Sequence, residues 1–213
     1  MFVTTPENLL GLRKSFAVNP DNLPKNDRVN VRNETLASGL RVRVYSPKNE
    51  KEEYPALLWI YGGDLSAATT LMTRDKKDPA LCFQMLLYPM LDYRNVTPSS
   101  HQLNDHHSWS RDSNLAAWGM YLADVSGDVP AYASPSMAGD LSGLPPAYVL
   151  AYGLDPFRDE DIDYAQRLMK AGVPVELHVV PGVTHSFEFG CAGTEIADRT
   201  VREYVNALYE AMK

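Results

Sequence analysis

The stretch A-L-L-W-I-Y-G-G-D-L-S-A-A-T-T-L-M, at residues 56–72, predicts the fold of this 213-residue chain. It opens with a continuous apolar run at residues 56–60, which is typical of a strand buried on both faces of a mostly parallel sheet. Gly62 and Gly63 follow, and they allow a sharp turn and a close approach to a ligand because they lack a Cβ atom. The stretch therefore predicts a buried strand that ends in a glycine turn.

A helix is expected directly after this turn. It should begin at Leu65, with Asp64 as its N-cap, and end before Pro79. Residues 83–88 follow as another buried strand, so strand, helix and strand would form a βαβ unit with a parallel strand pair. Free N–H groups at the helix start and the helix dipole point the same way, which predicts an anion-binding turn.

The rest of the chain continues the alternation of strands and helices. The patterns predict half-exposed strands at 29–31 and 40–45, a buried strand at 147–153, a last strand at 175–180, and amphipathic helices at 159–171 and 194–212. The fold class is therefore α/β, a mostly parallel sheet with helices on both faces, in a single domain over residues 1–213. Residues 1–26 and 95–129 do not fit the sheet, and we expect them to form segments above it.

Composition limits the classes of function. Hydrophobic residues make up 45% and charged residues 22%, as in ordinary soluble proteins, and the net charge of −7 argues against a nucleic-acid binder. The sequence shows no signal peptide and no run long enough to span a membrane, so a cytoplasmic protein is expected. The two cysteines, Cys82 and Cys191, have neither disulfide nor metal-ligand spacing, and no metal or cofactor is implied.

Two side chains of catalytic type follow neighbouring predicted strands. Asp155 comes directly after the strand at 147–153, and His185 follows the strand at 175–180. Adjacent parallel strands place their C-terminal loops side by side, so the carboxylate and the imidazole can meet. An Asp that accepts from His Nδ1 fixes the tautomer and makes Nε2 more basic. Spacing alone gives equal weight to an alternative in which Asp155 opens a turn and His185 is a loop residue.

Longer motifs extend through most of the chain. They are W-I-Y-G-G at 59–63, L-L-Y-P-M-L-D at 86–92, Y-A-S-P at 132–135, D-L-S-G-L-P-P-A-Y at 140–148, G-L-D-P-F-R-D-E at 153–160, Y-A-Q-R-L-M-K-A-G-V-P-V-E at 164–176 and P-G-V-T-H-S-F at 181–187. The motifs are most specific from Leu86 onward. With them the chain resembles the hormone-sensitive-lipase-like branch of the α/β-hydrolases, which includes bacterial acetyl-esterases and other carboxylesterases.

The resemblance implies a function and roles for individual residues. It implies hydrolysis of short or medium acyl esters by a serine-hydrolase mechanism, with a small-molecule ester as the partner. Asp155 would be the triad acid and His185 the triad base, while the N–H groups of Gly62 and Gly63 would belong to the oxyanion hole. The segments at 1–26 and 95–129 would then form a helical cap over the acyl pocket.

The chain also departs from the family pattern. The family's H-G-G-G motif reads Y-G-G-D at 61–64, and no G-x-S-x-G nucleophile elbow occurs in the sequence. The part from Leu65 resembles the helix that normally follows the nucleophile. An internal deletion or a mis-joined gene is the simplest account, and it would remove two central strands. The strand at 57–60 is then expected to pair with 41–45 on one side and 83–88 on the other.

The missing elbow leaves two functions open. Ser66 is the only serine near the turn, but it lies one residue too far along and lacks flanking glycines, so a helix residue is favoured over a nucleophile. Cys191 beside His185 is favoured as a plain loop or core thiol. The chain is then either a carboxylic-ester hydrolase that retains Asp155 and His185, or an inactive homologue or acyl-pocket binding module. Uncovered apolar surface also predicts reduced stability, aggregation or a homodimer.

Overall fold

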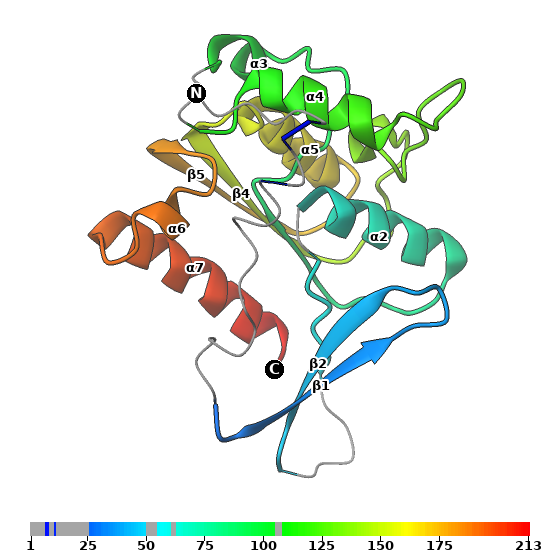
Figure 1. The fold of residues 1–213 in the computed structure, drawn as a ribbon, viewed down its shortest axis with the longest axis vertical. Helices are drawn as coiled ribbons and strands as arrows, with labels where there is room; N and C mark the ends of the chain where they lie inside the picture. The colour runs from blue at the N-terminus through cyan, green and yellow to red at the C-terminus, as the bar shows by residue number, and fades with distance from the viewer. Residues whose placement is uncertain (1–6, 9–10, 12–25, 50–54, 61–62, 105–107) are drawn as a thin grey trace. The chain divides into compact units, whose positions relative to one another are not determined.

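The computed structural model describes residues 7–8, 11, 26–49, 55–60, 63–104 and 108–213 (Figure 1). By their contacts, residues divide into one compact unit of Met1–Leu10 with Leu58–Lys213 and a second of Gly11–Leu57. The single domain expected over residues 1–213 stays a prediction.

The smaller unit contains an antiparallel hairpin. Strand β1 (Val29–Thr35) pairs along its whole length with β2 (Arg41–Pro47), so that Val29 lies opposite Pro47 and Thr35 opposite Arg41. The turn closes where the Leu36 N–H donates to the Leu40 carbonyl at 2.8 Å, and Gly39 supplies the positive φ of 83° that this turn requires. The two half-exposed strands predicted in this part of the sequence are therefore confirmed.

The larger unit contains a parallel three-stranded sheet in the order β3-β4-β5. Gln84 of β3 lies opposite Ala147 of β4, which lies opposite Val175 of β5. The elements of this unit are α2 (Gly63–Lys76), β3 (Gln84–Leu87), α3 (Pro98–Gln102), α4 (Arg111–Tyr121), β4 (Ala147–Leu154), α5 (Arg158–Lys170), β5 (Val175–Thr184), α6 (Phe187–Gly190) and α7 (Glu195–Ala211).

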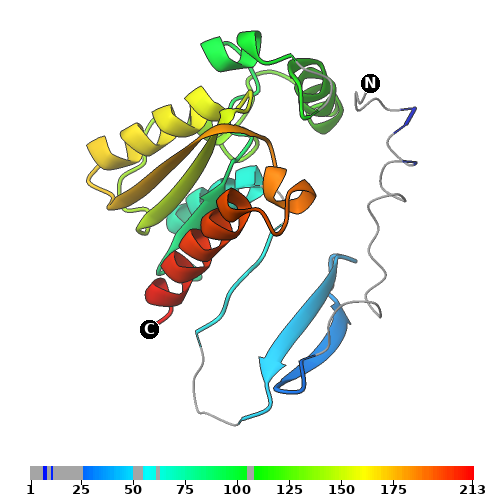
Figure 2. The same ribbon diagram turned by 90° about the vertical axis from the view of Figure 1, so that its left-hand side faces the viewer.

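Helices cover both faces of this sheet. Figure 2 shows α5 and α7 on opposite sides of the strands. On one face, Leu71 of α2 and Leu168 of α5 pack with Val149 of β4, and on the other, Ala197 of α7 packs with Leu150 of β4. Because β4 is covered on both sides, its first six residues are all buried, as expected for a continuous apolar run. The α/β fold class, with a mostly parallel sheet and helices on both faces, is confirmed.

The strand predicted at residues 56–60 is wrong. Residues 55–60 have no regular secondary structure, and Leu57, Leu58 and Trp59 are 52%, 66% and 62% exposed. In the described part of the chain β3 pairs only with β4, and β2 only with β1. A strand needs a neighbour to take up its backbone N–H and C=O groups, and neither expected neighbour pairs with this run. The predicted βαβ unit therefore lacks its first strand.

The helix after the glycine turn begins earlier than predicted. α2 starts at Gly63, so Asp64 lies in its first turn instead of preceding it as an N-cap.

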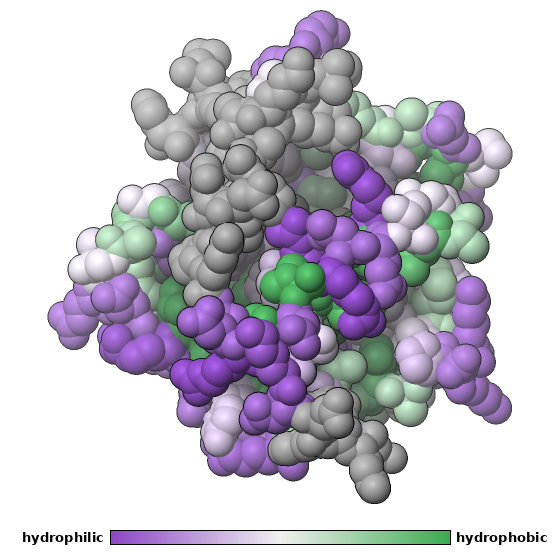
Figure 3. Space-filling view, turned by 60° about the horizontal axis from the view of Figure 1, so that its bottom comes forward, coloured by the Kyte–Doolittle hydropathy of each residue, from purple (hydrophilic) through white to green (hydrophobic). Residues whose placement is uncertain are grey.

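Hydrophobic side chains remain exposed among hydrophilic ones on the surface of the protein, as the face in Figure 3 shows. Within the described ranges, no helix combines the length and apolar character needed to cross a bilayer.

Candidate active site

The carboxyl ends of β4 and β5 bring Asp155 and His185 together. Leu154 lies opposite Thr184 in the parallel register, so the residues that follow them, Asp155 and His185, become neighbours. His185 Nδ1 lies 2.7 Å from Asp155 Oδ2, and the Asp155 side chain is 0% exposed while that of His185 is 21% exposed. An ionised carboxylate can only accept, so Nδ1 carries the proton and Nε2 is the basic nitrogen.

The local backbone supports this geometry. The Phe157 N–H donates to Asp155 Oδ1 at 3.1 Å, so both carboxylate oxygens of Asp155 accept a hydrogen bond. A Cβ atom at Gly153 would lie 3.1 Å from both the Gly182 nitrogen and the Pro181 Cα. Glycine therefore permits the close approach of β4 and β5 just before the two catalytic-type residues.

Aromatic rings surround the imidazole. The ring centroids of Tyr88 and Phe157 lie 4.9 Å and 5.3 Å from that of His185, and both rings meet it edge to face. The Trp109 ring lies 6.0 Å away. These rings restrict the rotation of the imidazole and leave part of it open to solvent. Tyr88 and Phe157 belong to motifs of the sequence resemblance, but the sequence alone suggested no contact with His185.

The segment at 95–129 reaches this site. Trp109 comes from this segment, and so does helix α3, whose Ser99 is fully buried. The Ser99 N–H donates to Asp159 Oδ2 at 2.7 Å, and its hydroxyl donates to the Pro156 carbonyl at 2.8 Å. These bonds attach α3 to the loop that follows Asp155 and to the first turn of α5. The contacts agree with the expected position above the sheet, and the cap function stays a prediction.

Two further carboxyl groups are buried in the first turn of α5, close enough to Asp155 to interact with it electrostatically. Glu160 Oε1 accepts from the N–H groups of Leu91 and Asp92 at 2.6 Å and 3.2 Å. Asp161 has no hydrogen-bond partner for either oxygen within the described ranges. Burial raises the pKa of both Glu160 and Asp161 well above the ordinary carboxyl range. Both acids lie in the first turn of α5, a position that favours acidic residues, and both are buried there.

The other predicted site residues are not joined to this pair. Gly62 lies outside the described residues, and Gly63 is the first residue of α2. Ser66 lies in the first turn of α2, where its carbonyl accepts from Thr70 Oγ1 at 2.7 Å. Among the hydrogen bonds of the described residues, none connects Ser66 to His185. Those residues also contain no cluster of three or more His, Cys, Asp or Glu side chains able to hold a metal ion.

Comparison with known proteins identifies the fold family. A family model described as alpha/beta hydrolase fold matches residues 61–189. The chain is 34% identical over 133 residues to the esterase LipI and 37% identical over 130 residues to the carboxylesterase NlhH, both of Mycobacterium tuberculosis. These matches cover 62% and 59% of this chain, and 41% and 40% of the relatives.

Solved structures agree with the sequence matches. A structure described as a bacterial heroin esterase aligns with a TM-score of 0.66 and 38% identity, over 71% of this chain and 49% of that chain. The esterase LipW from Mycobacterium marinum aligns with a TM-score of 0.66 and 32% identity, over 70% of this chain and 46% of that chain. The chain thus spans less than half the length of these relatives.

Proposed function

The chain belongs to the α/β-hydrolase fold family, and from this membership we propose that it hydrolyses carboxylic esters with Asp155 and His185 as its acid–base pair. The observation that carries the proposal is the 2.7 Å hydrogen bond between His185 Nδ1 and the fully buried Asp155 carboxylate. The relatives are named as esterases, which supports the same reaction. An inactive homologue or acyl-pocket binding module is not favoured by these comparisons.

The pair is suited to general acid–base catalysis. His185 Nε2 takes a proton from the hydroxyl that attacks the ester carbonyl, and the Asp155 carboxylate stabilises the imidazolium that forms. The imidazolium then returns the proton to the leaving alcohol as the tetrahedral intermediate collapses. The products are a carboxylic acid and an alcohol, and His185 is neutral again. The N–H groups of Gly62 and Gly63 are the proposed donors to the oxyanion.

Water is the proposed source of the attacking hydroxyl. The sequence contains no G-x-S-x-G elbow, and no hydrogen bond in the described part of the chain joins Ser66 to His185. Water assisted by one base is a weaker nucleophile than an activated serine, so we expect turnover of esters with good leaving groups and short acyl chains. A fluorophosphonate probe, followed by mass spectrometry of the peptides, tests this step. Covalent labelling of Ser66 would show that serine is the nucleophile.

The proposal is tested by hydrolysis of p-nitrophenyl acetate. His185→Ala should lower the rate by about 10²- to 10⁴-fold, the usual contribution of a positioned general base. Asp155→Asn should also lower it, because an amide cannot stabilise the imidazolium. His178→Ala is the matched control, since His178 is a half-buried histidine of β5 whose Nε2 lies 2.7 Å from Glu176 Oε1 and not near Asp155. Equal rates for the wild-type chain and His185→Ala would overturn the proposed function.

A further inference from the structure

A buried carboxylate lies close to His185 and has no role in the proposed mechanism. Glu188 is on the short helix α6, and only 5% of it is exposed. Its Oε1 accepts from the Tyr88 hydroxyl at 2.6 Å, and its Oε2 accepts from the Tyr152 hydroxyl at 3.0 Å. Burying a carboxylate is unfavourable unless its oxygens are hydrogen-bonded. Here two phenols, which come from two different strand ends, satisfy both oxygens.

The two tyrosine rings connect this carboxylate to the imidazole. The rings of Tyr88 and Tyr152 stack with centroids 4.8 Å apart. The Tyr88 ring then meets His185 edge to face, with centroids 4.9 Å apart and an interplanar angle of 77°. The Phe187 ring packs edge to face against Tyr152, with ring centroids 5.1 Å apart. Because each hydroxyl is bonded to Glu188, neither ring can slide or swing out of the stack without breaking a hydrogen bond to a buried carboxylate.

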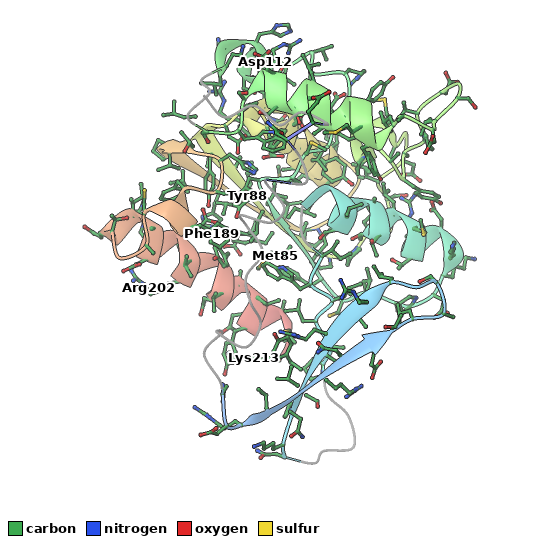
Figure 4. All side chains as sticks on the ribbon, in the orientation of Figure 1. Met85, Tyr88, Asp112, Phe189, Arg202 and Lys213 are labelled. Carbon is green, nitrogen blue, oxygen red and sulfur yellow. The ribbon has the colours of Figure 1, made fainter. Side chains whose placement is uncertain are left out.

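The backbone at Tyr88 is strained. Tyr88 directly follows β3 (Figure 4) and has a φ of 38°, a left-handed conformation that is uncommon for a bulky residue. Its N–H donates to the Leu150 carbonyl at 2.8 Å, which ties this conformation to β4. Such strain persists only where the surroundings hold it, and it is concentrated at functional sites. Here the strained residue is the one that contacts the imidazole.

Both tyrosine hydroxyls act as hydrogen-bond donors to Glu188. Burial in the first place, and the Glu188 carboxylate in the second, raise the pKa of both Tyr88 and Tyr152. Both hydroxyls therefore keep the protons that they donate to the Glu188 oxygens. Asp155, from the end of β4, faces the same imidazole through its hydrogen bond to Nδ1.

We propose that Glu188 is a positioning residue for His185, acting through Tyr88. The buried carboxylate fixes the two stacked rings, and the edge of that stack holds the imidazole in the plane in which Nδ1 donates to Asp155. Nε2 is then directed away from Asp155 toward the ester. The consequence for catalysis rests on the proposed function, whereas the consequence for ring orientation does not. Sequence alone gives no signal for this role, because Glu188 lies in a helix of four residues with no periodic pattern.

The test observes the hydrogen bond itself. The Nδ1 proton of a histidine bonded to a carboxylate gives a far-downfield proton NMR resonance, which His185→Ala should abolish and so assign. Glu188→Ala and Tyr88→Phe should broaden or remove this resonance by freeing the ring stack. Glu188→Gln should retain part of the intensity of this resonance, because the amide oxygen still accepts a hydrogen bond from one phenol. Glu176→Gln is the control, since Glu176 is exposed and pairs with His178.

The outcomes separate this inference from the proposed function. If Glu188→Gln and Tyr88→Phe fold cooperatively and leave the resonance unchanged, the positioning role is wrong, whatever the ester assay shows. If the resonance responds as expected, the inference stands even for a chain without His185-dependent turnover. Where turnover is present, these variants should lower kcat by up to about 100-fold with little change in KM, as expected for a misplaced base. Adding them to His185→Ala should cause no further loss.

Discussion

Asp161→Asn should stabilise the protein, by an amount that depends on pH. Asp161 is 0% exposed, and neither carboxylate oxygen has a partner within the described ranges. Burial, followed by the nearby charges of Glu160 and Asp155, raises the pKa of Asp161 well above its usual value. The unfolded chain ionises this group near its reference pKa of about 3.9. The contribution of protonated Asp161 to the free energy of unfolding is therefore fully present below the unfolded-state pKa. It is lost as the pH rises through the folded-state pKa.

The size of the effect follows from proton linkage. Between the two pKa values the folded state binds one more proton than the unfolded state, which lowers the free energy of unfolding by about 1.4 kcal/mol per pH unit. Asparagine has nearly the same shape as aspartic acid and cannot ionise. The gain in free energy of unfolding from Asp161→Asn should therefore begin near pH 4 and grow by about 1.4 kcal/mol per pH unit. For a chain of this size, that corresponds to roughly 3 to 6 °C in Tm per pH unit.

Thermal unfolding followed by circular dichroism, from about pH 4 to about pH 8, measures this difference. Asp163→Asn is the matched control, because Asp163 lies on the same helix and is exposed. Its melting curves should follow those of the wild-type chain at every pH. If the Tm values of Asp161→Asn and the wild-type chain stay parallel across this range, Asp161 is ionised in the folded protein and the reasoning fails.

Other substitutions test the strand contacts, the core and the exposed run. Gly153→Ala should destabilise the chain by about 1–3 kcal/mol, measured by urea unfolding, because its Cβ atom meets backbone atoms of Gly182 and Pro181 at 3.1 Å. Tyr148→Phe should leave stability unchanged or raise it by up to about 1 kcal/mol, since the buried Tyr148 hydroxyl has no partner among the described residues. Leu58→Lys should reduce self-association in light scattering, because Leu58 is 66% exposed in an apolar run.

The central strands and the Asp–His pair could be predicted from sequence for a shared reason. The runs at 147–153 and 175–180 form adjacent parallel strands, and the sequence order alone then places Asp155 and His185 at the same edge of the sheet. Each residue lies just beyond its own strand, so the pairing needs only these two strands and their adjacency. Spacing alone gave equal weight to a turn and a loop residue, and the 2.7 Å contact between the side chains decides for the pair.

The failures concern features that depend on distant partners. The run at 56–60 has the pattern of a buried strand, but a strand exists only where a neighbour accepts its backbone groups, and the pattern does not report the neighbour. The acids at 159–161 have the pattern of a first helical turn and do lie in one, but that pattern carries no signal that Glu160 and Asp161 are buried by other elements. Glu188 gains its environment from Tyr88 and Tyr152, which lie far from it in sequence.

These observations divide the site into two halves that depend on different parts of the chain. The acid–base half depends on the β4–β5 ladder, where Leu154 lies opposite Thr184, and this ladder is complete without the run at 56–60. The proposed oxyanion donors, Gly62 and Gly63, belong to the turn that follows that run. Leu58→Lys should therefore leave the Nδ1 proton resonance of His185 unchanged, whereas Gly153→Ala should shift it by forcing β4 and β5 apart. The reverse pattern would mean that the two halves are not independent.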